Sequence, residues 1–174
     1  MGLLPQDYEV PESGSANMFA KLEPGENRFR ILAEPTVGWI HWEDKHPTRY
    51  KEPGDVPTGA TDVKHFWFVP VWMNDQVCFL EMAQKSVIRE LKFLDDSKEW
   101  SDIDKYDVIV RRDGEGLDTE YFVQPCPKKA LPKAAKDAWA AALPGYKPEM
   151  LFVEDGVVYT PPKKDGDDED SLPF

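Results

Sequence analysis

Aromatic side chains are concentrated between residues 28 and 79, where they lie beside cationic side chains. Six rings lie in or beside predicted strands: Trp39, Trp42, Tyr50, Phe66, Phe68 and Trp72. Six cations accompany them: Arg28, Arg30, Lys45, Arg49, Lys51 and Lys64. Exposed rings stack on the bases of single strands for ~1–3 kcal/mol each, while Lys and Arg neutralise phosphates. The pattern predicts a surface on which these rings meet bases and these cations meet phosphates.

The strand that carries most of these rings predicts which of them face outward. Residues 63–73 alternate, with a more aliphatic set that we expect to face the core: Trp67, Val69 and Val71. The other set is then outward: Lys64, Phe66, Phe68 and Trp72. The alternative is that a later helix covers Phe66 and Phe68, because exposed apolar patches are rare unless functional. Trp39 and Trp42 fall on opposite faces of a regular strand, and we favour Trp42 for stacking.

The last ten residues form a second group with recognisable chemistry. Asp165 to Phe174 carries five carboxylates, which predicts a disordered, solvated tail, yet the chain ends in an apolar tip. A ring in a partner's pocket and carboxylates held by Lys or Arg would suit capture by another protein. The residues expected to bind a partner are Asp167, Asp168, Glu169, Asp170, Leu172, Pro173 and Phe174. The alternative is a solubility tail that stops at Phe.

Composition argues against several classes of function. The sequence lacks the nucleophile, phosphate-loop and zinc-protease motifs, so we expect no catalytic residues and no cofactor. Cys78 and Cys126 have no CxxC partner and the three histidines have no ligand spacing, so no metal site is expected. No signal peptide or apolar run of ~18 residues is present, which predicts a cytoplasmic protein that does not enter a membrane.

Net charge counts against a nucleic-acid partner, since backbone affinity comes largely from Lys and Arg. The chain has a net charge of −12, of which the tail supplies five negatives. Residues 28–64 hold six bases and six acids and are therefore the least repelling region. A basic segment at residues 128–136 either flanks the nucleic-acid site or receives the acidic tail.

The elements that must position these residues are mainly β. We expect a strand kinked at Pro35 and Gly38, a long loop at 43–62, a hairpin of 63–73 with 76–82, a helix at 84–95, and strands at 106–112 and 117–124. That order is typical of the OB-fold, a five-stranded Greek-key barrel with its helix between strands 3 and 4. A short helix at 133–143 then follows, its narrow stripe centred on Trp139.

The elements divide the chain into four parts. Residues 1–25 form a flexible arm, 26–125 the OB-fold domain, 126–160 an extension packed on the barrel, and 161–174 the tail. Pro and Gly without periodicity define the arm, and Pro161-Pro162 releases the tail.

The chain resembles the bacteriophage single-stranded DNA-binding proteins in three segments and the tail. The segments are Gly25 to Leu32, Lys64 to Trp67 and Gly114 to Tyr121. The tail is also similar to that of bacterial single-stranded DNA-binding proteins, which ends in Ile-Pro-Phe, with Leu172 here in place of Ile. The resemblance implies an OB-fold protein that coats and protects single-stranded DNA in phage replication, recombination and repair, in the host cytoplasm, and recruits partner proteins through its tail.

Two departures from that family leave points open. The long loop and the Trp139 helix leave both monomer and dimer possible. Two other functions also stay open: an OB-fold module whose aromatic face binds a polypeptide, and an RNA-binding OB protein that uses ribose 2′-OH contacts.

Overall fold

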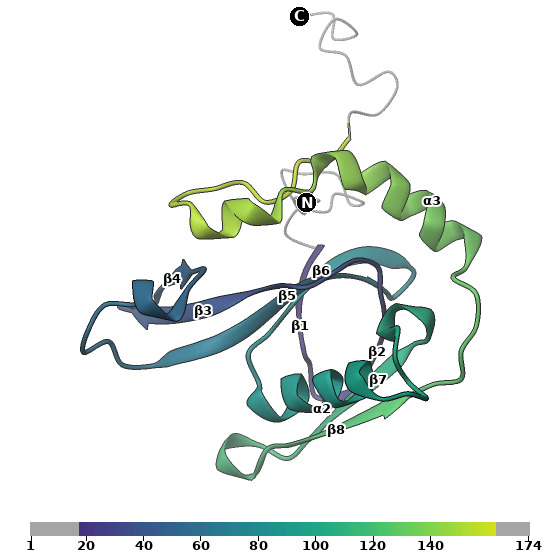
Figure 1. The fold of residues 1–174 in the computed structure, drawn as a ribbon, viewed down its shortest axis with the longest axis horizontal. Helices are drawn as coiled ribbons and strands as arrows, with labels where there is room; N and C mark the ends of the chain where they lie inside the picture. Colours follow the sequence, from purple (N-terminus) through teal and green to yellow (C-terminus); the bar gives the residue numbers. More distant parts are fainter. Residues whose placement is uncertain (1–17, 163–174) are drawn as a thin grey trace, which may run out of the picture.

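The computed structural model describes residues 18–162, which form a mainly β protein (Figure 1). Its strands are β1 (Phe19–Lys21), β2 (Gly25–Ile31), β3 (Thr36–Glu43), β4 (His46–Tyr50), β5 (Val63–Met73), β6 (Gln76–Met82), β7 (Val108–Asp113) and β8 (Glu120–Pro125). Its helices are α2 (Lys85–Asp96) and α3 (Lys133–Ala142), with short 3-10 turns η2 (Ile103–Lys105), η4 (Leu143–Gly145) and η5 (Pro148–Phe152) among the connections. The predicted mainly β class is confirmed, and β1 lies in the segment expected to be part of the arm.

The strands form one mixed sheet that does not close on itself within residues 18–162. Its order is β1-β6-β5-β2-β7-β8, with β3 also paired to β5 and β4 paired to β3. Every pair is antiparallel except β1 with β6. The strands and helix occur in the predicted chain order, but a closed five-stranded barrel is not confirmed.

The kinked first strand of the prediction is in fact two strands that share β5 as a neighbour. β3 pairs with β5 from Val63 to Phe68, and β2 pairs with it at Val71 and Trp72. Pro70 lies between these two stretches, where its missing N–H removes no strand-pairing bond, and its carbonyl accepts the Leu32 N–H at 2.9 Å.

Strand β4 was not predicted, because the expected loop at 43–62 contains almost no aliphatic residues. Asp44 and Lys45 have φ of 49° and 67°, which makes the two-residue turn that joins β3 to β4. Asn74 and Asp75, with φ of 54° and 60°, form the predicted turn between β5 and β6 in the same way. A tight turn therefore brings Tyr50 opposite Trp39, although the composition of β4 is typical of a loop.

The first hydrophobic core lies between the sheet and α2. Val69 and Val71 of β5 face it as predicted, together with Phe29 and Ile31 of β2. Helix α2 contributes Val87, Leu91 and Leu94, which recur at helical spacing. The one aromatic residue of this helix, Phe93, is exposed to solvent. The amphipathic helix predicted from the sequence is thus confirmed.

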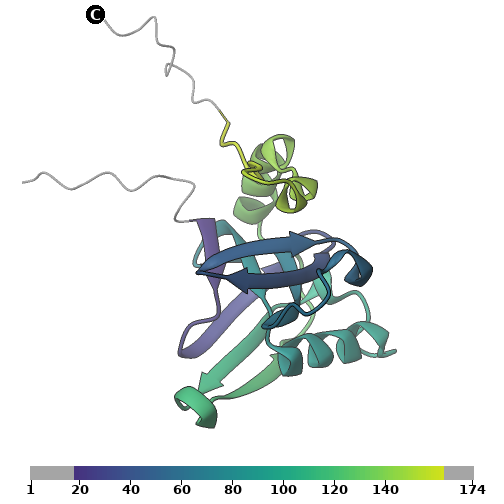
Figure 2. The same cartoon turned by 90° about the vertical axis from the view of Figure 1, so that its left-hand side faces the viewer.

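A second core lies on the opposite face of β5, under α3 and the chain that follows it. α3 and α2 lie on opposite sides of the sheet in both views (Figures 1 and 2). Phe66 and Phe68 are 0% and 2% exposed here, which corrects the prediction that they face outward. The extension shares this core through Ala142, Trp139, Tyr146, Val158 and Tyr159, and Phe152 of η5 packs on the Phe66 ring with centroids 6.3 Å apart. Phe68 packs on Phe19 of β1 and on Phe79, so the two rings are covered as the alternative expected, but by η5 and β1 rather than by the helix itself.

Phe79 of β6 is the centre of this second core, with 0% exposure. It stacks on Tyr146 with ring centroids 5.1 Å apart, and Tyr159 packs against it at 4.9 Å. One ring therefore joins the sheet to the extension after α3.

Truncating Phe79 should destabilise the fold strongly, because it leaves a cavity among several rings. We expect Phe79→Ala to lower the free energy of unfolding by ~3–5 kcal/mol. Urea denaturation followed by circular dichroism measures the loss. Phe93→Ala, at a ring that is 69% exposed, is the matched control and should change stability by less than ~0.5 kcal/mol. Equal losses in the two variants would contradict the second core.

Two tyrosines, the buried Tyr106 and the half-buried Tyr146, should make the fold sensitive to alkali. Burial raises the pKa of Tyr106, whose hydroxyl donates to the Trp100 carbonyl, and that of Tyr146, each from 10.0 to about 12. Below pH 10 both phenols are protonated in the folded and unfolded chains, so they leave stability unchanged. Between pH 10 and about 12 the unfolded chain loses protons that the folded chain keeps, so stability should fall.

Urea midpoints at stepped pH values, with phenolate absorbance recorded in parallel, test this expectation. Tyr146→Phe removes one of the two groups and should lessen the alkaline fall. A flat stability up to pH 12 would contradict it.

Candidate nucleic-acid interface

Three rings line up across β4, β3 and β5. Trp39 is in register with Tyr50 on β4 and with His65 on β5, so the three side chains project from the same face. The Trp39 and His65 ring centroids are 4.9 Å apart. Val37 and Trp67, the next register pair, continue the row on the same face. We call these five residues the aromatic face; Val37 is exposed and the four rings are half-buried.

The aromatic face lies on the same side of β5 as the first core and begins where the cover by α2 ends. Trp67 packs partly against that core, while Trp39, two residues along β3 from Val37, lies beyond it. The sequence analysis missed Val37, His65 and Trp67 as site residues. The register of β3 with β5 identifies all three, because residues paired across an antiparallel ladder share a face.

The other predicted rings lie on the opposite face of these strands. Phe66 and Phe68 are buried in the second core, and Trp72 packs partly against it. Trp42, which the sequence favoured, is 39% exposed, and the Lys21 ammonium lies 5.8 Å from its ring centroid. The structure therefore separates Trp39 and Tyr50 from the rest of the predicted stacking set.

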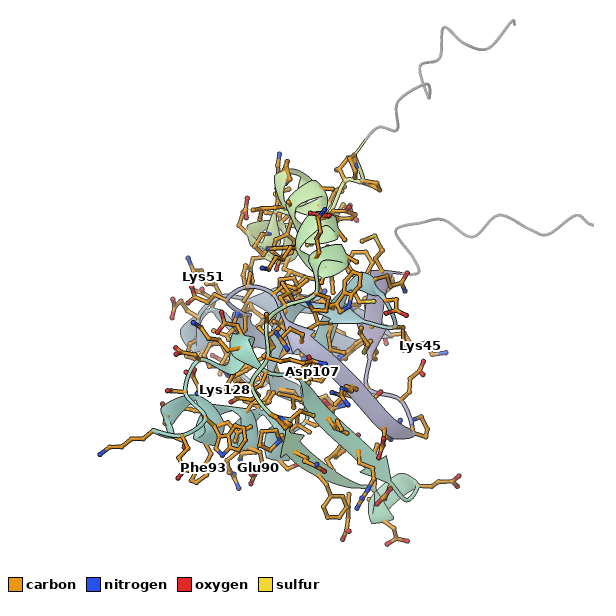
Figure 3. The ribbon with its side chains drawn as sticks, turned by 90° about the vertical axis from the view of Figure 1, so that its right-hand side faces the viewer. Lys45, Lys51, Glu90, Phe93, Asp107 and Lys128 are labelled. Atoms are coloured by element: carbon orange, nitrogen blue, oxygen red, sulfur yellow. The ribbon has the colours of Figure 1, made fainter. Side chains whose placement is uncertain are left out.

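Among the predicted phosphate contacts, Arg49 already has a partner. Its Nη2 lies 2.7 Å from Glu81 Oε2, and its guanidinium carbon is 5.8 Å from the Phe66 ring centroid. Lys45, Lys51 and Lys64 are exposed, with Lys45 in the β3–β4 turn and Lys51 just after β4 (Figure 3). Within residues 18–162, none of these three lysines is in an ion pair; Lys64 pairs with Ile40 and so projects from the face opposite the aromatic face.

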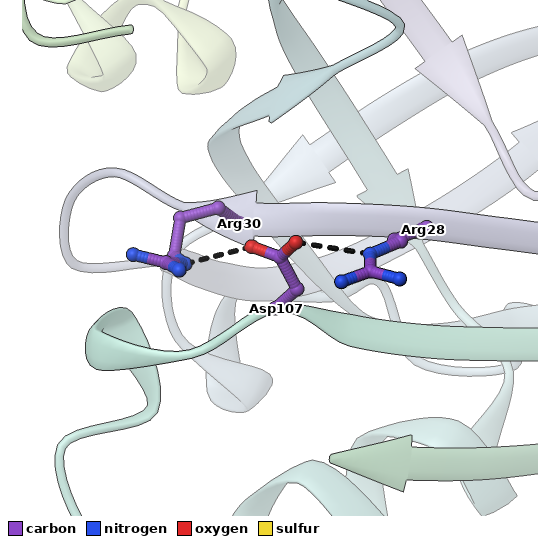
Figure 4. Close-up of polar contacts among 3 residues, drawn as sticks. All are labelled: Arg28, Arg30 and Asp107. Atoms are coloured by element: carbon purple, nitrogen blue, oxygen red, sulfur yellow. Dashed lines mark hydrogen bonds and ion pairs between the residues drawn. The ribbon is translucent and has the colours of Figure 1, made fainter. Parts of the chain in front are cut away.

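Arg28 and Arg30 share one carboxylate (Figure 4). The Nε atoms of Arg28 and Arg30 donate to Asp107 Oδ2 and Oδ1, each at 2.9 Å. The hydrogen bond to Asp107 raises the pKa of the exposed Arg28. Arg30 is 1% exposed, which corrects the expectation that it lies on an open outer face. Spacing alone could not show that residues 104–105 and 128–136 cover this side of β2.

A cavity of about 450 Å³ adjoins the aromatic face at Trp67 and Val37. Ile31 and Pro35 add apolar wall, and three carboxylates also line it: Glu34, Asp95 and Asp104. An apolar wall with carboxylate acceptors suits the ring and exocyclic amino group of a base better than a phosphate.

No protein-family model matches the sequence, and no curated protein or solved structure is significantly similar to the chain. Residues 18–162 contain no cluster of three or more His, Cys, Asp or Glu side chains that could hold a metal ion. In that same range, no helix has the length and apolar character needed to cross a bilayer. The predicted partner-binding tail, including Phe174, lies outside the described residues.

Proposed function

We propose that this protein binds single-stranded DNA on the aromatic face and coats exposed strands during phage DNA replication, recombination and repair. The observation that carries the proposal is the row of Tyr50, Trp39 and His65, continued by Trp67. Partly exposed rings on neighbouring strands supply stacking platforms at intervals along a sheet, which is how sequence-tolerant binding to single strands works. The acidic tail recruits partner proteins to the coated strand in this proposal.

The strand pairings support an OB-like topology, which we propose in a partly open form. β2 and β3 together take the place of the first OB strand, since they pair with β5 on one side and β7 on the other. β5 and β6 are then the second and third strands, and α2 follows them. OB-folds bind oligonucleotides on the face of strands 2 and 3 and on the loop before strand 2. The aromatic face lies on β5 and on the neighbouring β3 and β4, so it corresponds to the second OB strand and the loop before it.

The charge distribution shapes how binding would work. Glu81 and Asp107 neutralise Arg49 and Arg30, which leaves Lys45, Lys51 and Lys64 as the exposed cations of the hairpin and β5. Stacking then supplies more of the affinity than phosphate contacts do. We therefore expect a salt dependence weaker than that of a strongly basic protein.

Removing the central ring of the row should weaken binding without harming the fold. We expect Trp39→Ala to raise the Kd for poly(dT) by about 5- to 150-fold, which corresponds to ~1–3 kcal/mol for one base. Fluorescence anisotropy of a labelled oligo(dT) measures the Kd, and circular dichroism checks the fold.

Trp42→Ala is the matched control, because it removes the same side chain from the opposite face of the same strand. If Trp42→Ala lowers DNA affinity more than Trp39→Ala does, the bound DNA lies on the opposite face of the sheet. Absence of oligo(dT) binding at low salt would contradict the function and favour a polypeptide ligand. Tighter binding of oligo(U) than of oligo(dT) would favour an RNA-binding protein.

Deleting the tail should strengthen DNA binding, because it removes five negative charges from residues 165–174. The same deletion should abolish capture of replication proteins in a pull-down. Phe174→Ala is the control that keeps every charge, and it should lose capture while its DNA affinity stays unchanged. Unchanged or weaker DNA affinity in the deletion variant would contradict the electrostatic role.

A further inference from the structure

A second cavity, of about 500 Å³, concentrates positive charge in an otherwise acidic protein. It lies between the end of β2, the η2 turn and the segment that leads into α3. Five basic side chains line it: Arg30, Lys105, Lys128, Lys129 and Lys136. The single acidic side chain in its lining is that of Asp104. Like charges on one cavity wall repel one another, so the cluster itself costs electrostatic free energy.

Backbone hydrogen bonds hold the lysines in place. The Cys126 N–H donates to the Asp107 carbonyl at 2.8 Å, and the Lys129 N–H donates to the Lys105 carbonyl at 3.3 Å. Residues 126–129 thus run alongside residues 105–107. Lys128 and Asp107, one from each segment, are labelled in Figure 3. Within residues 18–162, none of the four lysines is in an ion pair.

Arg30 gives the cavity a buried donor that lacks a partner. Its Nε is satisfied by Asp107, but Nη2 is buried with no hydrogen-bond acceptor in the described part of the chain. Asp107 also forms an ion pair with Arg28, so one negative charge is shared between two guanidinium groups. A buried N–H without an acceptor is costly, and an anion that entered the cavity as far as the Arg30 guanidinium would supply the missing acceptor.

We propose that this cavity binds a phosphate group from the backbone of the bound strand. A guanidinium beside several ammonium groups is the donor set that proteins use for phosphate. Ile31 and Asp104 line both this cavity and the one at Trp67, so the two adjoin. A strand whose bases stack on the aromatic face reaches the lysines by continuing past Ile31. The proposal rests on the proposed function and names its phosphate subsite.

The first test compares two double variants that remove the same charge. Lys128→Ala with Lys129→Ala should weaken binding to oligo(dT) and lower the slope of log K against log salt by about 0.7, the change expected for one phosphate contact. Lys85→Ala with Lys98→Ala, two exposed lysines away from the cavity, is the control and should leave the slope unchanged. Equal slopes in the two double variants would overturn the subsite while DNA binding itself stands.

The second test needs no DNA, so it separates the subsite from the proposed function. Inorganic phosphate added to the full chain should shift the Arg30 Nε–H and Lys129 amide resonances in NMR, and sodium chloride at equal ionic strength should not. Equal shifts with chloride would reduce the cavity to general ion screening and overturn the proposal. Shifts with a peptide of residues 165–174 but not with phosphate would overturn it in favour of the tail. Phosphate shifts without oligo(dT) binding would keep the phosphate site and reject its DNA source.

Discussion

Strand β5 is apolar on both faces, and most of the architecture follows from the need to cover both. Val69 and Val71 face the core under α2, while Phe66 and Phe68 face the core under α3. The extension covers the second face: Phe152 packs on Phe66 of β5, and Tyr146 and Tyr159 pack on Phe79 of the neighbouring β6. The sheet is therefore the middle layer between two helices. On the α2 side, the β3–β4 end of the sheet extends past the first core.

That end is where the aromatic face lies, and its position follows from the same constraint. α2 covers the part of β5 that carries Val69 and Val71, so Trp67 is only partly covered and His65, at the far end, lies beside Trp39. The β3–β4 turn adds Tyr50 to the row. Rings half-buried against one another are held in fixed orientations, so stacking a base on them costs less conformational entropy than on freely rotating side chains.

Much of the fold could be predicted from the sequence because its signals are local. Neighbouring residues determine the helical spacing in α2, the turn at Asn74 and the order of the elements along the chain. The site was harder, because strand alternation separates two faces but does not say which face the rest of the chain covers. Alternation places Phe66 on the outer face, and its cover, Phe152, comes from a segment far later in the chain. Trp39 and His65 meet only through a register that β3 and β5 set together.

Arg30 shows why an acidic protein is not thereby excluded from binding phosphate. Two guanidinium groups share Asp107, and four lysines surround the same cavity, so the local balance is positive although the chain carries −12. Charges farther away than about 8 Å are largely screened at physiological salt, which makes the nearby balance matter more than the total. An acidic surface around a basic cavity would also weaken binding of nucleic acid elsewhere on the protein. In the proposed function, single-stranded DNA would then be held mainly where stacking rings and phosphate donors lie side by side. The cavity beside the aromatic face and the basic cavity meet at Ile31.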